Sequence, residues 1–381
     1  MNLRILFALL VGIELGVVFM NIPPALNPLM ALYGTSYTGI SWLISAILWS
    51  HSFIQIPGGM VTDRLGVRRS LMASLILISC GNLLPALVPS FGLAVIGRIA
   101  TGLGTGISFV ATMKLVSLYA PQGRAGAFQA FFGGFFSLGS ILAYLLIPVL
   151  VSSAWQWAYL LPGLLGLPLI LWLSLLSLNE IRGFSSAMPL KEILTLPIGW
   201  TLGIYHALSY GTMINLGNWV PSLLAETLPG RTAASLAWGG ALVMLISGFG
   251  RLGGGFILLK IRPELIANGT ILIVTFLCGS LFMLDQPSPV LVLSLLTALF
   301  ASVNFGAFFH IASQATPPGS LATLFGFINL LANLGAILFT LMFGWVKDAS
   351  GSFSYGFAVL TLLGFTAFVV GRIVIRKNAG G

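Results

Sequence analysis

The chain has 381 residues, of which 57% are hydrophobic and only 7% are charged. A water-exposed globular domain carries about a quarter charged residues, so this composition excludes one and indicates a protein of the lipid bilayer. The formal net charge of +9 suits basic cytoplasmic loops better than a nucleic-acid-binding surface. Cys80 and Cys278 both lie in apolar stretches, so neither a disulfide framework nor a metal site is expected.

Hydropathy and the Pro, Gly and polar breaks predict an all-α integral membrane protein with twelve spanning helices. The first segment, MNLRILFALLVGIELG, starts like a signal peptide but lacks a small-residue cleavage site, so it is interpreted as a retained span. Pro23, Pro24 and Pro28 predict a bend near the outer end of this span. In chain order the expected spans are about 4–30, 40–60, 70–88, 91–118, 126–151, 156–178, 194–224, 235–258, 265–284, 288–312, 323–346 and 354–372.

The longest polar interval, residues 179–193, predicts a cytoplasmic linker between an N-terminal six-helix half (1–178) and a C-terminal six-helix half (194–381). With the N-terminus inside, twelve of the 17 Lys and Arg residues fall on the cytoplasmic side, two fall outside and three lie within spans. This asymmetry predicts that both termini are cytoplasmic. We expect a monomeric, multi-pass protein of the bacterial inner (plasma) membrane.

The two halves align at one fixed offset of 196 residues. FVATMKLVSLYAPQG (109–123) pairs with FGAFFHIASQATPPG (305–319), SLGSILAYLL (137–146) with NLGAILFTLM (333–342), and the Gly pair 58–59 with the Gly pair 254–255. Parallel repeats related by an axis along the membrane normal are an architecture of secondary transporters, whose substrate site lies near the middle of the membrane.

The segment GGMVTDRLGVRR (58–69) contains the pattern G-x-x-x-D-R-x-G-x-R-R, formed by Gly59, Asp63, Arg64, Gly66, Arg68 and Arg69. It resembles the signature loop of the major facilitator superfamily, and GRIATGLGTG (97–106) resembles the second motif of that superfamily. The resemblance extends over the whole chain. It implies alternating access, in which the two halves rock around a central cavity.

Within this loop, Asp63 is expected to act as a cytoplasmic latch. It could pair with neighbouring arginines or with the N-terminus of a facing helix, while Gly59 allows another helix to approach closely. The alternative is a plain basic loop on the cytoplasmic side. In the second half Leu259 replaces the aspartate, so a latch there would be degenerate.

Ionisable side chains inside spans are costly and indicate function. Glu14 is the acid placed deepest in a span, and it is predicted to bind the coupling proton; the alternative is a structural pair with a basic residue. Asn21 shares its helix face and is a candidate substrate contact. Arg98, in the second motif, is predicted to be either structural or part of the proton relay.

Arg251 is the predicted contact for an anionic substrate, with a gate salt bridge as the alternative. The repeat pairs Arg251 with Gln55, and one turn before each lie Ser247 and His51, so Gln55 and His51 are candidate substrate contacts as well. This arrangement is similar to that of nitrate/nitrite porters, which hold the anion with one arginine on each of two helices. Because Gln55 stands in place of the second arginine, a nitrate/nitrite-type inorganic anion porter is kept only as an alternative.

Other polar side chains could orient a substrate, with interhelical hydrogen bonding as the alternative for each: His206, Tyr210, Asn329 and Asn333. Lys114 and its repeat partner His310 lie near the cytoplasmic ends of their helices. Lys114 is predicted to face the pathway, unless its side chain instead reaches out to the membrane interface.

Three basic residues against one acid within the spans favour a small organic anion or zwitterion as substrate, moved by proton-coupled symport. The alternatives are a proton-coupled exporter of lipophilic compounds and, outside the transporters, a membrane sensor or scaffold. The sequence contains no nucleophile–base set, metal motif or P-loop spacing, so neither an enzyme activity nor a cofactor is predicted. The expected partners are the small-molecule substrate, H⁺ and the lipid bilayer.

Overall fold

The computed structural model describes residues 2–35, 37–178, 188–228, 230, 238–284 and 287–379, and over these residues it is helical without strands. Most of the predicted linker, residues 179–187, lies outside the described residues. Contacts divide the chain into two compact units. Unit 1 comprises Met1–Pro121, Phe135–Met188 and Pro317–Gly326, and unit 2 comprises Gln122–Gly134, Pro189–Thr316 and Phe327–Gly381.

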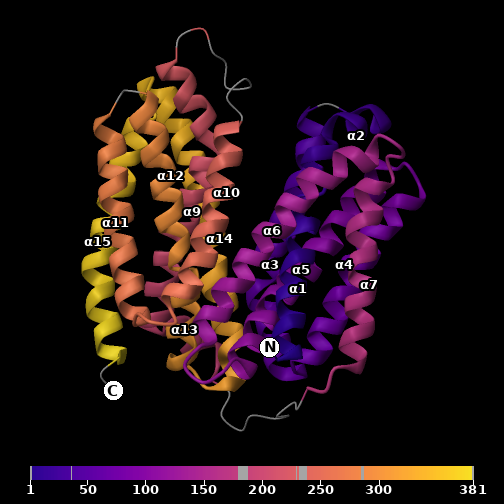
Figure 1. The fold of residues 1–381 in the computed structure, drawn as a ribbon, viewed down its shortest axis with the longest axis horizontal. Coiled ribbons are helices and arrows are strands. Elements are labelled where there is room, and N and C mark those ends of the chain that lie inside the picture. Colours follow the sequence, from indigo (N-terminus) through magenta and orange to yellow (C-terminus); the bar gives the residue numbers. More distant parts are fainter. Residues whose placement is uncertain are drawn as a thin grey trace. The chain divides into compact units, whose positions relative to one another are not determined.

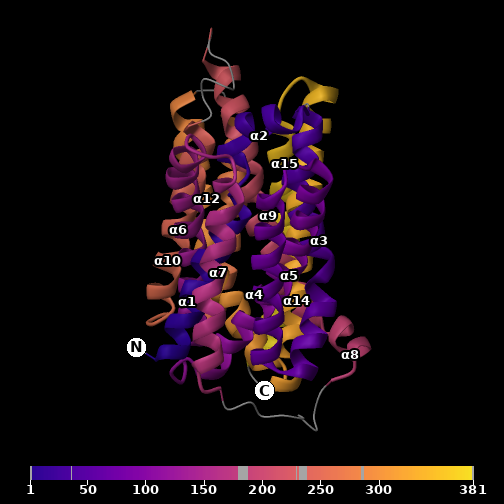
Figure 2. The same cartoon turned by 90° about the vertical axis from the view of Figure 1, so that its right-hand side faces the viewer.

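Unit 1 is a bundle of long helices (Figures 1 and 2). They are α1 (Leu3–Phe19), η1 (Pro23–Ala25), α2 (Leu26–Tyr33), α3 (Tyr37–Leu65), α4 (Val67–Leu87), α5 (Phe91–Tyr119), the later part of α6 (Ala125–Val151) and α7 (Trp157–Leu175). Helix α5 is central, because it packs against α1, α3 and α4, while α7 covers α1 and α4. The apolar core includes Val17, Leu43, Ala94, Ile147 and Tyr159.

Unit 2 contains the short helix α8 (Leu190–Thr195) and a second bundle. Its helices are α9 (Pro197–Thr227), α10 (Trp238–Ile257), α11 (Pro263–Met283), α12 (Pro287–Val303), α13 (Phe305–Ala315), the later part of α14 (Leu321–Ser350) and α15 (Ser354–Ala379). The 3-10 turn η3 (Pro318–Ser320) and the beginning of α14 belong to unit 1. The apolar core includes Leu216, Val243, Cys278, Phe343 and Phe357.

The two units repeat one pattern of helix pairing, which confirms the internal repeat. In unit 1, α5 packs on α1, α3 and α4; in unit 2, α12 packs on the corresponding helices α9, α10 and α11. Likewise α7 packs on α1 and α4, as α15 does on α9 and α11. The corresponding helices α6 and α14 each begin in one unit and continue in the other. The predicted division at the linker remains a prediction.

Among the described residues, ten helical segments are long and apolar enough to cross a membrane. Helices α3 and α9, with 29 and 31 residues, bring the arrangement to the predicted twelve spans, since about 20 residues suffice at ~1.5 Å per residue. The first span breaks after Phe19, where Pro23 and Pro24 provide no backbone N–H for a continuing helix, so the predicted bend is present.

A second break, which the sequence did not predict, separates α12 from α13 at Asn304. The side-chain nitrogen Nδ2 of Asn304 donates to Ser209 Oγ on α9 at 2.8 Å and to Thr270 Oγ1 on α11 at 3.0 Å. These bonds fix the buried break against two neighbouring helices.

Candidate functional site

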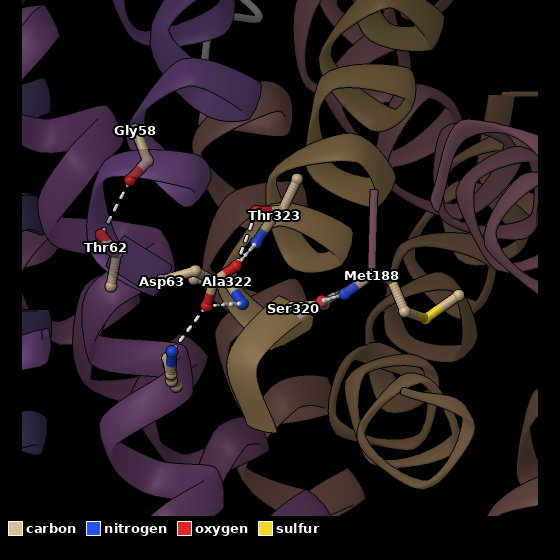
Figure 3. A network of polar contacts seen from close by, with 8 residues as sticks. Gly58, Thr62, Asp63, Met188, Ser320, Ala322 and Thr323 are labelled. Carbon is tan, nitrogen blue, oxygen red and sulfur yellow. Dashed lines mark hydrogen bonds and ion pairs between the residues drawn. The ribbon is translucent and has the colours of Figure 1, made fainter. Parts of the chain in front are cut away.

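Asp63, two residues before the end of α3, meets the first turn of α14 (Figure 3). Its carboxylate accepts hydrogen bonds from Ala322 N at 3.2 Å, from Thr323 N at 2.9 Å and from Thr323 Oγ1 at 2.6 Å. The first N–H groups of a helix have no intrahelical partner and carry partial positive charge, so a carboxylate is stabilised there. Of the two partners expected for Asp63, the structure shows the helix N-terminus.

Lys114 on α5 provides a further partner that the sequence did not predict. Its Nζ lies 2.5 Å from Asp63 Oδ1, and the two side chains are only 3% and 6% exposed. The Lys114 side chain is therefore directed to Asp63 rather than to the membrane interface. Asp63, Lys114, Ala322 and Thr323 together are called the Asp63 cluster below. Its assignment as a substrate contact remains a prediction.

Gly59 lies one turn before Asp63 and allows α3 to touch α14. A Cβ at this position would lie 2.5 Å from Ala322 O and 2.6 Å from Thr323 Cα, both backbone atoms. One turn earlier still, the backbone oxygen of Gln55 closely approaches Gly326. Residues 55, 59 and 63 thus form one stripe of α3 that packs on the start of α14, because residues four apart share a helix face.

The rest of the loop motif shapes the connection from α3 to α4. Gly66 has φ +89°, a left-handed conformation that favours glycine, and it is the N-cap of α4. Arg68 donates to the carbonyl of Ser174 near the end of α7, whereas Arg64 and Arg69 are exposed. Arg68 therefore connects the loop to α7, while Arg64 and Arg69 lie on the exposed face of the loop.

Arg98 on α5 is buried and binds the broken end of α1. Its Nη1 donates to Val18 O at 2.9 Å and to Asn21 Oδ1 at 2.7 Å, and its Nε donates to Leu43 O at 3.3 Å. Asn21 in turn donates to Ala158 O on α7 at 2.9 Å. This network connects α1, α3, α5 and α7, and through it Arg98 binds the Val18 carbonyl group near the break in α1.

Glu14 is buried with a relative exposure of 1%. Neither carboxylate oxygen has a hydrogen-bond partner among the residues that the structure describes. A Cβ at Gly166 on α7 would lie 2.6 Å from Glu14 Oε1 and closer still to Ser79 Oγ on α4. Glu14 therefore points between α4 and α7, and the contacts of Arg98 go to Asn21 instead.

His51 and Gln55 are both buried on α3 and contact each other. Gln55 Nε2 lies 2.6 Å from His51 Nε2, and His51 Nδ1 lies 3.1 Å from Thr105 Oγ1 on α5. Close approach of α5 brings Thr105 there, since a Cβ at Gly106 would lie 2.8 Å from the backbone oxygen of His51. The side-chain oxygen of Gln55 has no partner among the described residues.

In unit 2, Arg251 on α10 is buried among aromatic and polar side chains. Its guanidinium lies over the Phe305 ring at 5.1 Å, and Nη1 makes one long hydrogen bond of 3.5 Å to Gly133 O. It is close enough to act electrostatically on His206 and Tyr210. No carboxylate of the described residues forms an ion pair with it.

The neighbouring candidates surround this arginine from other helices. His206 on α9 contacts the rings of Tyr210 and Phe305 at 5.8 Å and 5.7 Å, and it lies close to Asn329 on α14. Asn333 lies one turn further along α14 and is half-buried. The structure thus brings together Arg251, His206, Tyr210 and Asn329, which the sequence had proposed separately.

His310 belongs to a different place. It lies on α13 beside Gln314, with 3.3 Å between their Nε2 atoms, and the start of α6 at Gly126 packs on its Cβ. It therefore occupies in unit 2 the position that Lys114 has in unit 1, next to the first turn of a packed helix.

A family model described as Major Facilitator Superfamily matches residues 8–340. The chain belongs to the Major Facilitator Superfamily. Members of this superfamily are transporters and not enzymes, and the chain is a multi-pass integral membrane protein. The predicted twelve-helix fold and the predicted superfamily are confirmed.

Within the superfamily, the cyanate transport protein CynX of Escherichia coli is 23% identical over 386 residues, which cover 97% of this chain and 95% of CynX. The uncharacterized MFS-type transporter EfpA of Mycobacterium tuberculosis is 28% identical over 136 residues, and the match spans only 26% of its length. The solved fucose:proton symporter FucP of Escherichia coli has a TM-score of 0.82 at 17% identity, with 98% of each chain covered. The human organic anion transporter MFSD10 has a TM-score of 0.77 at 17% identity, with 97% of this chain and 99% of its own covered.

Proposed function

We propose that this superfamily member is a secondary active transporter of a small organic anion or zwitterion. It works by alternating access and moves the substrate together with protons. The observation that carries the proposal is Arg251, a buried arginine for which no described carboxylate provides an ion pair. A buried guanidinium without a counter-ion is costly, and a bound anion would remove that cost.

The other two basic residues within the spans already have polar partners in the structure, although the Nη2 of Arg98 has no described partner. Lys114 pairs with Asp63 at 2.5 Å. Arg98 donates to two carbonyl oxygens and to the Asn21 amide. This leaves Arg251 as the strongest candidate for direct contact with an anion, with His206, Tyr210 and Asn329 placed to orient it.

The names of relatives agree with an anionic substrate. CynX, which matches over nearly its whole length, is named for the transport of cyanate, a small anion. A probable anion transporter of Arabidopsis thaliana chloroplasts is 26% identical over 233 residues. These names support the charge argument and leave open which anion is carried.

The Asp63 cluster supplies an element that alternating access requires. Four polar contacts and the close approach at Gly59 hold α3 on the start of α14. We propose that they hold the cytoplasmic side shut and break when it opens, with both termini cytoplasmic and the protein in the bacterial inner membrane. Glu14 remains the carboxylic acid proposed from the sequence to bind a coupling proton.

The test is anion binding and uptake by the purified protein in liposomes. Cyanate, acetate, pyruvate, nitrate and phosphate are screened by the rise in unfolding temperature, because a ligand that binds the folded state stabilises it. Radiolabelled uptake of the stabilising anion is expected to fall at least tenfold in Arg251→Gln. Arg372→Gln, which changes an exposed arginine of α15, is the matched control and keeps uptake. Undiminished uptake by Arg251→Gln contradicts the proposal.

A further inference from the structure

The hydrogen bonds around His51 determine which of its ring nitrogens carries a proton. The Thr105 hydroxyl donates to Gly102 O at 3.0 Å, so its oxygen is left to accept from His51 Nδ1–H at 3.1 Å. On a neutral ring the other nitrogen, Nε2, is then an acceptor. It receives the Gln55 amide N–H at 2.6 Å, and the Gln55 oxygen is directed away without a described partner.

A second proton on this ring would reverse the arrangement. Both nitrogens of an imidazolium donate, so Nε2–H can no longer face the NH₂ group of Gln55. The side-chain amide of Gln55 must flip, so that its oxygen and nitrogen exchange places and the oxygen accepts from His51 Nε2–H. The NH₂ group then occupies the place where the unpartnered oxygen was, and it presents two donors there.

We propose that His51 and Gln55 form a proton-dependent switch for anion binding. With His51 neutral, Gln55 presents an oxygen that repels an anion. With His51 protonated, Gln55 presents N–H donors next to a positive ring. The proton taken up by Nε2 and the anion accepted by Gln55 therefore bind together, and both leave together when Nε2 is deprotonated.

The internal repeat indicates that Gln55 is placed to meet the substrate. Gln55 and Arg251 are separated by the repeat offset of 196 residues, as are His51 and Ser247. Arg251 offers N–H donors at all times, whereas Gln55 at the equivalent place offers them only when His51 is protonated.

The latch described above decides when Gln55 is covered. Gln55 is fully buried, and its backbone is packed against Gly326 on the same stripe of α3 that carries Gly59 and Asp63. When these contacts with the start of α14 break, Gln55 is the next residue of the stripe to be uncovered. Release of the anion and of the proton would follow opening of the latch.

Among the residues that the structure describes, no charged side chain contacts the His51 ring. Helix α1 places the Phe19 ring at 5.0 Å, α5 places Thr105 and the Phe109 ring at 6.2 Å, and α3 itself places Gln55. None of these groups is ionisable, and no charged side chain among the described residues acts on the ring electrostatically. The bond to Gln55 is therefore the contact that senses the ring's protonation.

This inference rests on the proposed anion transport, and the experiment separates the two. Full-length protein in liposomes is titrated with cyanate and with acetate across pH 5 to 8, and radiolabelled uptake and exchange of the same anions are measured. Because one proton binds with each anion, wild-type affinity is expected to rise by about tenfold for each unit fall in pH within the window where His51 titrates.

His51→Gln and Gln55→Met are the two test variants, because the first cannot bind the proton and the second has no amide to turn. Both are expected to lose most of this slope, to less than about threefold per pH unit. His51→Gln is expected to lose uptake driven by a pH gradient. Ser52→Ala changes the next residue of α3, which bonds only its own helix at Leu48 O, and it keeps the wild-type slope.

The outcomes are distinct. A wild-type slope in both test variants overturns the switch while leaving anion transport intact. If the wild type binds neither probe at any pH, the proposed function fails and the switch fails with it. Should His51→Gln not fold, Gln55→Met carries the same expectation.

Discussion

The contact between Asp63 and Lys114 allows one quantitative test of the latch, by changing Asp63 to Asn. The atoms lie 2.5 Å apart with both side chains more than nine-tenths buried. With an effective dielectric constant of ~20, their attraction is about 7 kcal/mol, much of it offset by the loss of hydration. Removing one partner of such a pair costs about 3–5 kcal/mol, because the other charge stays buried and unpaired.

The Asp63→Asn change should therefore favour the unlatched state by at least about 100-fold, since 1.4 kcal/mol corresponds to a factor of ten. Hydrogen exchange of the Ala322 and Thr323 amides reports this directly, because both N–H groups donate to Asp63. Their exchange is expected to accelerate by about the same factor, while amides of α15 serve as the internal reference.

The double variant Asp63→Asn/Lys114→Met separates the ion pair from the helix-terminal bonds. Once the unpaired lysine is gone, the first turn of α14 should exchange at least about tenfold more slowly than in Asp63→Asn alone. Equal exchange in the single and double variants would refute the reasoning, since Lys114 would then contribute nothing to the closed state.

Two further predictions concern packing and charge inside the bundles. Gly59→Ala is expected to accelerate exchange in the first turn of α14 at least about tenfold, because its Cβ would meet backbone atoms of α14 at 2.5 Å and 2.6 Å; Gly253→Ala, with no atom within 4 Å, is the control and should exchange normally. Glu14→Gln is expected to unfold within about 2 °C of the wild type, because the buried carboxyl has no described partner and an uncharged amide suits its site. If the unfolding temperature of Glu14→Gln instead falls by more than about 5 °C, Glu14 is ionised and paired in the wild type.

Sequence patterns predicted the fold well because membrane spanning and repetition leave strong signals. The twelve spans follow from apolar length, and the proline bend after Phe19 follows from the missing N–H groups. The break at Asn304 has no such signal, since an isolated asparagine is compatible with a continuous helix. At the break the Asn304 side chain bonds α9 and α11, and these are contacts that only tertiary structure supplies.

The site shows the same limit. A carboxylate at a helix end left two expected partners for Asp63, neighbouring arginines or a helix N-terminus, and the structure shows the helix N-terminus. The ion pair with Lys114 joins residues 51 positions apart on different helices, so no local pattern indicates it. A useful signal was available, because Lys114 and Asp63 are opposite charges expected near the same membrane face. The tautomer of His51 depends on Thr105, which likewise no single helix reveals.

Helices α6 and α14 each begin in one unit and continue in the other, and this affects any attempt to produce the protein as two separate fragments. Unit 1 is completed by residues 317–326, and unit 2 by residues 122–134. A polypeptide ending at the linker would thus leave Gly59 and Asp63 without the backbone that covers them. Neither half, produced alone as a fragment, would be self-sufficient, and functional reconstitution from two separately encoded pieces would require that each donate the beginning of an internal helix, α6 or α14, to the other.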